Sequence, residues 1–479
     1  MSAPVLGERV HLIGIGGAGM SGIARILLAR GVPVSGSDAK DSRAVLALRA
    51  LGARVEVGHA AAHLPDAPAT VVVSTAIRAT NPELAAARER GLPVVHRAQA
   101  LAALTVGRRL AAVAGTHGKT STTSMLSVAL QHCGLDPSFA IGGDLASSGT
   151  GAHHGEGDVF VVEADESDGS FTAFAPDVAV VTNVEPDHLD HHGTEEAYRA
   201  VFATFVDRIS PAGTLVACAD DPGVAVLVDH ARARGLTVRT YGRSGEDAVL
   251  LDFVPDGAGS RVRVRIQGEE LTLRLAVPGV HMALNALGAA LAAVELGAHP
   301  RCLTEGLAAF DGVRRRFEYR GRADGVAVYD DYAHHPTEVA ATLRAARDVA
   351  MPGTRVVVAF QPHLYSRTRT FAAAFGEALG LADEVVVLDV YAAREDPEPG
   401  VSGALVADAV PLPAERVHYV PRWADVPAVL AGLARPGDLV LTMGAGDVTV
   451  LGPEVLVELE RRAGSRTAGS TAAPGRPRP

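Results

Sequence analysis

The sequence predicts an α/β fold distributed over three domains. Apolar runs of strand length alternate with helical patterns from one end of the chain to the other, which is typical of parallel sheets covered by helices. The chain has 479 residues, and a usual domain size of roughly 150 residues suggests about three domains. Its composition, with 48% hydrophobic, 21% charged and 4% aromatic residues, is that of a globular protein.

The first hundred residues predict a Rossmann-like domain. A strand at 10–16 (VHLIGIG) precedes a helical pattern at 20–31 (MSGIARILLARG), and further strands follow at 32–38 (VPVSGSD) and 70–76 (TVVVSTA). We place this domain at 1–106, because a new strand and a second glycine loop begin directly afterwards.

The central part predicts a P-loop ATP-binding domain over 107–312. Its strands are expected within 158–168 (DVFVVEADESD) and 178–188 (VAVVTNVEPDH). The most apolar segment, 275–298, carries Pro278, His281 and Asn285, so we expect a buried helix there and not a membrane span.

The third part repeats the alternation and predicts a second Rossmann-like domain, over 313–462. We expect strands within four runs, VAVYDDY, RVVVAFQP, EVVVLDVY and DLVLTMGAG. Residues 463–479 are small, polar and proline-rich, which predicts a disordered tail.

Charge and cysteine content exclude several classes of protein. The net charge of −11 argues against a nucleic-acid partner. Cys133, Cys218 and Cys302 lie far apart and in no C-x-x-C pairing, so we expect neither a disulfide framework nor a cysteine metal site. With no signal-peptide pattern at the N-terminus, the sequence predicts a cytoplasmic protein without membrane association.

The first glycine loop predicts a diphosphate site. Gly14, Gly16, Gly17 and Gly19 stand between a strand and a helix, where backbone amides and a helix N-terminus bind a pyrophosphate. Asp38 ends the next strand, where a ribose-binding acid is expected. A nicotinamide dinucleotide and a UDP-linked substrate both fit this pattern.

The second glycine loop predicts an ATP site. In GTHGKTS, residues 115–121, the loop follows an apolar strand and opens a helix, with a lysine for the β and γ phosphates and a hydroxyl for Mg²⁺. Of the 44 basic residues only Lys40 and Lys119 are lysines, which indicates a specific task for Lys119.

Acidic and histidine residues follow the two central strands. Glu163 and His188 are expected to face the phosphates from neighbouring strand ends, because ligands collect at the carboxyl ends of parallel strands. Together with Thr120 they form the predicted Mg²⁺ ligands. For His191 and His192 we favour a polar loop without a metal, since no zinc-type spacing accompanies them.

Seven motifs, in order, make the chain resemble the Mur ligase family: GIGGAGMSG, GTHGKTST, EADESDGSF, TNVEPDHLDH, DDYAHHPTE, FQPHLYSRT and MGAGD. The resemblance extends from Gly14 to Asp447 and is greatest to the branch that adds L-alanine to UDP-N-acetylmuramate. It implies ATP-dependent amide formation through an acyl phosphate in peptidoglycan precursor synthesis. The chain departs from the family pattern at Met282, where asparagine is common, and at Leu364, where arginine is common.

The resemblance also implies a role for each matching residue. Catalytic residues would be Lys119, Glu163, His188, His334 and Arg367. ATP would contact Gly115, Thr116, His117, Gly118, Lys119, Thr120, Ser121, His281, Asn285, Arg316 and Asp331, and Mg²⁺ would bind Thr120, Glu163 and His188. The UDP-sugar would lie at Gly14, Gly16, Gly17, Gly19 and Asp38, and the amino acid at Tyr332, His334, His363 and Arg367.

Three alternatives stay open at the level of sequence. A murein tripeptide ligase would share the ATP residues and the sugar nucleotide, and would differ in the amino-acid pocket. A nicotinamide-dependent dehydrogenase would leave Lys119 without a task, and a non-catalytic nucleotide-binding protein would bind ATP without substrate-dependent phosphate release. We expect a monomer or a homodimer.

Overall fold

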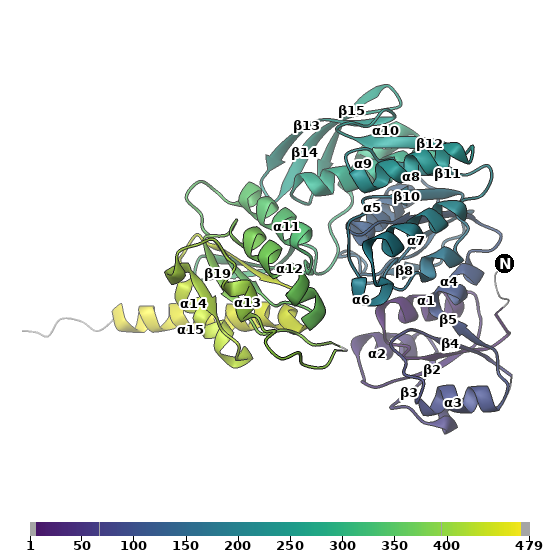
Figure 1. Ribbon diagram of the computed structural model, residues 1–479, viewed down its shortest axis with the longest axis horizontal. Coiled ribbons are helices and arrows are strands. Elements are labelled where there is room, and N and C mark those ends of the chain that lie inside the picture. The colour runs from purple at the N-terminus through teal and green to yellow at the C-terminus, as the bar shows by residue number, and fades with distance from the viewer. Residues whose placement is uncertain (1–5, 67, 394, 471–479) are drawn as a thin grey trace, which may run out of the picture. The chain divides into compact units, whose positions relative to one another are not determined.

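The computed structural model describes residues 6–66, 68–393 and 395–470 (Figure 1). It divides into two compact units. Unit 1 comprises residues 1–254, 261–276 and 281–313, and unit 2 comprises residues 255–260, 277–280 and 314–479. The two are described separately below.

Unit 1 begins with a five-stranded parallel sheet, within the described residues, in the order β3-β2-β1-β4-β5. Its strands are β1 (Val10–Ile13), β2 (Val34–Asp38), β3 (Arg54–Val57), β4 (Thr70–Val73) and β5 (Val94–His96). Its helices are α1 (Ala18–Ala29), α2 (Arg43–Ala50), α3 (Pro82–Glu89) and α4 (Arg97–Leu104), with a 3₁₀ turn, η1 (Ala61–His63). The three strands and the helix expected here are confirmed.

The second sheet of unit 1 has the order β15-β14-β13-β12-β11-β10-β6-β9-β7-β8 among the described residues. Its strands are β6 (Arg109–Ala114), β7 (Ser138–Ala140), β8 (Ala152–His153), β9 (Val159–Glu163), β10 (Val178–Val181), β11 (Thr214–Cys218), β12 (Thr237–Gly242), β13 (Ala248–Asp256), β14 (Gly259–Ile266) and β15 (Glu269–Leu275). Its helices are α5 (Lys119–His132), α6 (Leu189–His192), α7 (Glu195–Asp207), α8 (Pro222–Ala233), α9 (Val280–Glu295) and α10 (Pro300–Ala308), with a 3₁₀ turn, η2 (Ser170–Ala173).

The two sheets of unit 1 share one hydrophobic core. Met20 and Ile23 of α1 belong to the same buried cluster as Phe160 of β9 and Phe202 of α7. A methyl group on Gly22 of α1 would lie only 3.3 Å from the Cβ of Ala152 in β8. The glycine loops that begin α1 and α5 therefore belong to one packed body.

Three strands at one end of the central sheet, β13, β14 and β15, were not among those expected from the sequence. In β14 exposed Arg261, Arg263 and Arg265 alternate with buried Val262 and Val264. This period of two is the pattern of a strand with one face in water, and β13, β14 and β15 lie together at this end of the sheet (Figure 1).

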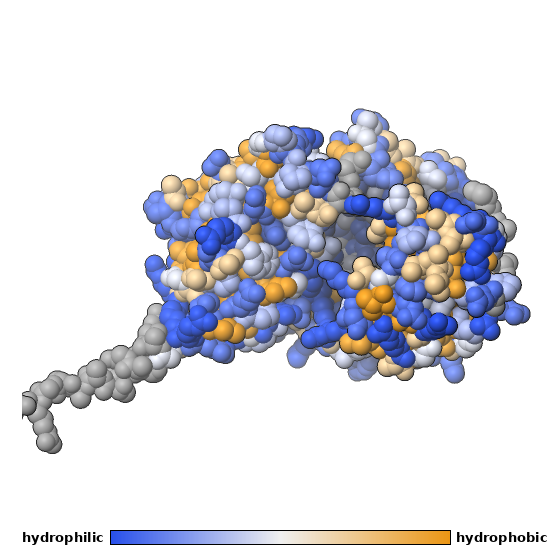
Figure 2. Space-filling model, turned by 90° about the horizontal axis from the view of Figure 1, so that it is seen from below, coloured by the Kyte–Doolittle hydropathy of each residue, from blue (hydrophilic) through white to orange (hydrophobic). Residues whose placement is uncertain are grey.

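The apolar segment after Pro278 is a buried helix, as predicted. Helix α9 (Val280–Glu295) buries Ala283, Leu287 and Leu291 completely. Among the described residues, no helix is both long and apolar enough to cross a membrane. On the face shown in Figure 2, hydrophilic residues are interspersed with small apolar areas, which is ordinary for a globular protein.

Unit 2 contains a sheet with the order β16-β17-β21-β18-β19-β20 among the described residues, in which only β16 pairs antiparallel to its neighbour. Its strands are β16 (Glu318–Ala323), β17 (Val326–Asp331), β18 (Val356–Phe360), β19 (Glu384–Val387), β20 (Val417–Tyr419) and β21 (Leu439–Met443). Helices α11 (Pro336–Val349), α12 (Tyr365–Leu379) and α13 (Ala404–Ala407) cover one face, and α14 (Val426–Leu433) and α15 (Leu451–Ser470) cover the other (Figure 1). The 3₁₀ turns are η3 (Ala414–Arg416), η4 (Trp423–Asp425) and η5 (Asp447–Val450).

The four strands expected in the third part are present as β17, β18, β19 and β21. The chain differs at its end, because α15 continues through Ser470 where the sequence predicts a tail from residue 463. Residues 471–479 of the expected tail lie outside the described residues.

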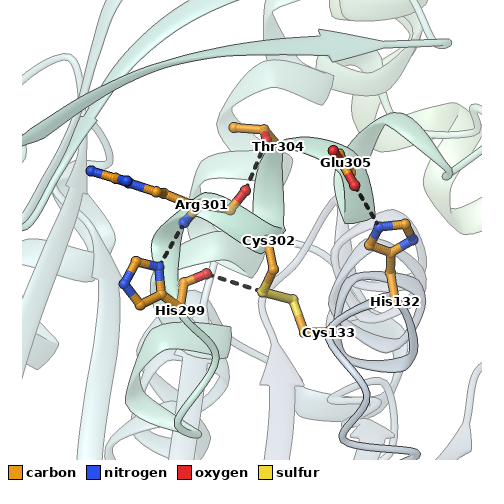
Figure 3. The surroundings of a disulfide bond; sticks show 7 residues. All are labelled: His132, Cys133, His299, Arg301, Cys302, Thr304 and Glu305. Carbon is orange, nitrogen blue, oxygen red and sulfur yellow. Dashed lines mark hydrogen bonds and ion pairs between the residues drawn. A yellow bond between two sulfur atoms is a disulfide. The ribbon is translucent and has the colours of Figure 1, made fainter.

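The sequence predicts no disulfide framework, yet one disulfide is present. Cys133 and Cys302 form a disulfide, 169 residues apart in sequence, and Cys218 is a buried free thiol. Figure 3 shows the bond linking the end of α5 to α10, and on the same pair of helices His132 lies 3.3 Å from Glu305. Packing of α10 against α5 brings the two cysteines together, so their separation in sequence was no guide to their distance in space.

Candidate functional site

The first glycine loop is fixed to the end of β2. The amides of Gly14 and Ile15 donate to the Ser37 carbonyl at 2.8 and 3.0 Å, and the Gly16 amide donates to Asp38 Oδ2 at 2.8 Å. Asp38 therefore holds the loop in shape, in addition to its expected place beside the ribose. Gly17 precedes the first helical residue, Ala18, and Gly19 lies in the first turn of α1, so all the predicted loop residues lie together at this helix N-terminus.

The second loop turns sharply at two glycines. Gly115 has φ +137° and Gly118 has φ +80°, and a Cβ at Gly115 would lie 2.0 Å from Thr182 Oγ1. Both positions therefore require glycine. Thr116 and His117 donate their amides to the carbonyl and side-chain oxygens of Asn183, at 3.0 and 2.8 Å. Asn183 braces the loop and was not among the predicted site residues, although it belongs to the TNVEPDH motif.

Hydrogen bonds hold the Lys119 side chain against this loop. Its Nζ donates to the Gly115 and Thr116 carbonyls at 2.8 and 3.0 Å and lies 2.8 Å from Glu166 Oε2. Burial alone would lower the pKa of the ammonium, but the charges of Glu166, Asp165 and Glu163 raise it above its ordinary value. Lys119 therefore carries a full positive charge at the position where phosphates are expected.

Glu166 is a site residue that sequence reasoning missed. Its side chain is 1% exposed, and burial raises the pKa of its carboxyl to about 7, with Lys119 opposing this shift. His188 Nε2 lies 3.6 Å from Glu166 Oε1, and His192 Nε2 lies 3.0 Å from the Glu166 carbonyl oxygen. The only signal in the sequence was the density of acids in EADESD, which does not say which of them faces Lys119.

Two of the three expected Mg²⁺ ligands lie in direct contact. Thr120 Oγ1 donates to Glu163 Oε1 at 3.0 Å, and Glu163 Oε2 accepts the Gly142 amide at 2.7 Å. A hydroxyl and a carboxylate at this separation fit the oxygen ligands and short bonds that Mg²⁺ requires. His188 lies beside Glu166 and Asp187.

The expected adenine side of the site also lies at the second loop. Asn285 of α9 stands so close to Gly118 that a Cβ there would lie 2.6 Å from Asn285 Oδ1. Its Nδ2 donates to the sulfur of Met282 at 3.7 Å. Met282, which departs from the family pattern, therefore contacts Asn285, which matches it. His281 lies in the first turn of the same helix, and Ser121 is buried in the first turn of α5.

Within unit 2, the Asp331 side chain accepts hydrogen bonds from the backbone just before β16 and just after β17. Its two carboxylate oxygens accept the amides of Phe317 and Ala333 at 2.7 and 2.8 Å. Burial raises the pKa of this carboxyl to about 6, against the opposing charge of Arg316. The guanidinium of Arg316 also lies 5.2 Å from the centre of the Tyr332 ring, a cation–π distance.

The residues expected at the amino acid form one cluster in unit 2. The Tyr332 and His334 rings lie 5.2 Å apart, and the His334 and His363 rings lie 6.1 Å apart. Arg367 Nη1 lies 3.3 Å from His363 Nδ1. Tyr391, which was not predicted, stacks on His363 at 5.7 Å.

Family models match the chain in three consecutive stretches. They are described as Mur ligase family, catalytic domain (residues 9–109), Mur ligase middle domain (113–293) and Mur ligase, glutamate ligase domain (315–446).

Curated relatives agree over nearly the full length. The chain is 66% identical over 464 residues to the UDP-N-acetylmuramate–L-alanine ligase of Saccharopolyspora erythraea, covering 96% of this chain and 94% of the relative. It is 64% identical over 457 residues to the enzyme of that name from Kineococcus radiotolerans, covering 95% and 97%.

Solved structures resemble the fold. The UDP-N-acetylmuramate-alanine ligase of Thermotoga maritima matches with TM-score 0.77 and 30% identity, covering 97% of this chain and 100% of that one. A murein peptide ligase of Psychrobacter arcticus matches with TM-score 0.69 and 25% identity, covering 95% and 99%.

Proposed function

Because this chain belongs to the Mur ligase family, we propose that it joins L-alanine to the carboxylate of UDP-N-acetylmuramate at the expense of ATP. The observation that carries the proposal is the identity of 66% and 64% to two alanine ligases over nearly the whole chain. The reaction belongs to peptidoglycan precursor synthesis. We further propose a cytoplasmic enzyme that works as a monomer or homodimer.

The proposed chemistry activates a poor electrophile. The γ-phosphoryl group passes from ATP to a carboxylate oxygen of the sugar nucleotide, which releases ADP and forms an acyl phosphate. The amino group of alanine then attacks the acyl carbon, phosphate leaves, and the amine loses a proton. His334 is the candidate to accept that proton, and Arg367 suits the carboxylate of the incoming alanine.

Residues of unit 1 supply the charge stabilisation for phosphoryl transfer. Lys119 exchanges part of its contact with Glu166 for the β and γ phosphates, while the Gly115 and Thr116 carbonyls keep its stem in place. Thr120 and Glu163, together with His188 beside Glu166, would hold Mg²⁺, which would supply further positive charge to the phosphate oxygens. Arg316 and Asp331 are the residues of unit 2 that we assign to ATP.

The test is release of inorganic phosphate from ATP and Mg²⁺, with UDP-N-acetylmuramate and L-alanine added singly and together. Release that needs both supports the proposal. Release with a murein tripeptide in place of alanine, and none with alanine, would instead identify a murein tripeptide ligase. Binding of NAD with no release at all would favour the dehydrogenase.

A further inference from the structure

Arg97 of unit 1 lies against Gly19, beside the first glycine loop, and near Asp165, and it was not predicted as a site residue. It is the first residue of α4, and a capping box fixes it there, because His96 caps the helix and Gln99 bonds back to the His96 amide at 3.0 Å. Helix α4 packs against both α1 and η2. The base of the Arg97 side chain is therefore held by rigid elements.

One side of the guanidinium rests on the first turn of α1. A Cβ on Gly19 would lie 2.7 Å from Arg97 Nη1 and 3.0 Å from its Cδ, so the absence of a side chain at Gly19 lets the arginine lie directly against the turn. The first turn of α1 consists of Ala18, Gly19, Met20 and Ser21, which carry no charge. The positive end of the helix and the guanidinium consequently add at one place. The turn itself carries no acid, and the acid nearest to it in the loop, Asp38, already accepts the Gly16 amide at 2.8 Å.

The other side of the guanidinium makes a weak contact with a shared acid. Arg97 Nη2 lies 3.4 Å from Asp165 Oδ2. Burial would raise the pKa of Asp165, but the charges of Lys119 and Arg97 hold it below its ordinary value. Because Asp165 also interacts electrostatically with Lys119, its negative charge neutralises Arg97 only in part. The Arg97 side chain is 23% exposed.

We propose that Arg97 binds the diphosphate of the sugar nucleotide, together with the amides at the start of α1. A planar guanidinium can donate two parallel hydrogen bonds to a phosphate, and a helix N-terminus favours the same anion. The inference rests on the proposed function, because that function places a UDP-sugar at the first glycine loop. Asp165 orients the guanidinium toward the loop.

The experiment measures binding of UDP-N-acetylmuramate, UDP and uridine by calorimetry to the wild-type enzyme and to Arg97→Gln, Arg97→Lys and Arg54→Gln. Arg54 is the control, because its side chain is 81% exposed on β3 and lies 3.5 Å from Glu56. A thermal melt of each variant establishes that it is folded.

We expect Arg97→Gln to lower the affinity for both UDP-N-acetylmuramate and UDP about tenfold or more, because charge-assisted hydrogen bonds to the diphosphate are lost. Uridine, which has no phosphate, should change less than about twofold. Arg97→Lys should bind the two diphosphate ligands with intermediate affinity, and Arg54→Gln should bind them as tightly as wild type does. Equal binding of UDP by wild type and a folded Arg97→Gln, or an equal loss for uridine, would overturn the inference. If wild type bound no UDP-N-acetylmuramate, the proposed function would fail as well.

Discussion

The disulfide between Cys133 and Cys302 gives unit 1 a stability that depends on reductant. Closing a loop of 169 residues removes chain entropy from the unfolded state worth about 5 kcal/mol in the loop-closure model. Domains of this kind gain roughly 2 to 4 °C in melting temperature per kcal/mol. Reduction should therefore lower the melting temperature by about 10 to 20 °C.

The assay is thermal unfolding followed by circular dichroism, with and without dithiothreitol. The double variant Cys133→Ser/Cys302→Ser should melt at the temperature of the reduced wild type and should not respond to reductant. Cys218, a buried thiol outside the disulfide, is kept in all samples. Turnover below the melting range should hardly change, because the 14 residues of α5 put Lys119 about 20 Å from the disulfide end of the helix. Equal melting of wild type in both conditions would refute the reasoning.

Three further predictions concern single side chains. Lys119→Met should lower kcat on the order of 10² or more by removing a preorganised charge; near-normal turnover would mean that the loop is not the ATP site. Glu166→Gln should lower kcat about tenfold, and should have no further effect in a Lys119→Met background, because Glu166 acts through Lys119; additive losses would contradict this. For Asp331 the folded-state pKa of about 6 lies above the ordinary value of 3.8, so the folded protein binds an extra proton and loses stability as the pH rises from 4 to 6. The free energy of unfolding should fall by about 3 kcal/mol over this range. In denaturant unfolding, Asp331→Asn should lack this dependence on pH; an unchanged dependence would assign it to another group.

The main strands and both glycine loops could be predicted because their signals are local. An apolar run followed by glycines and a helical pattern specifies a strand, a turn and a helix within about twenty residues, as at β6, Gly118 and α5. Glu163 was found by the same logic, since it is the last residue of β9. Parallel strand ends then bring it to Thr120.

What could not be predicted depends on contacts between distant segments. Glu166 lies three residues beyond the strand, and only the folded loop shows that it faces Lys119. Arg97 is one arginine among many, and its place beside Gly19 follows from the packing of α4. Cys133 and Cys302 likewise meet only because α10 packs on α5. The alternation in β14 was a readable signal that the strand expectations left out.

Isotope transfer shows whether the carboxylate is activated by phosphorylation and then joined to alanine. UDP-N-acetylmuramate labelled with ¹⁸O in its carboxylate is converted with ATP, Mg²⁺ and L-alanine, and the released phosphate is analysed by mass spectrometry. The account predicts one ¹⁸O atom in each phosphate and a UDP-sugar product extended by one alanine. Unlabelled phosphate, or phosphate released without the alanyl product, would contradict it.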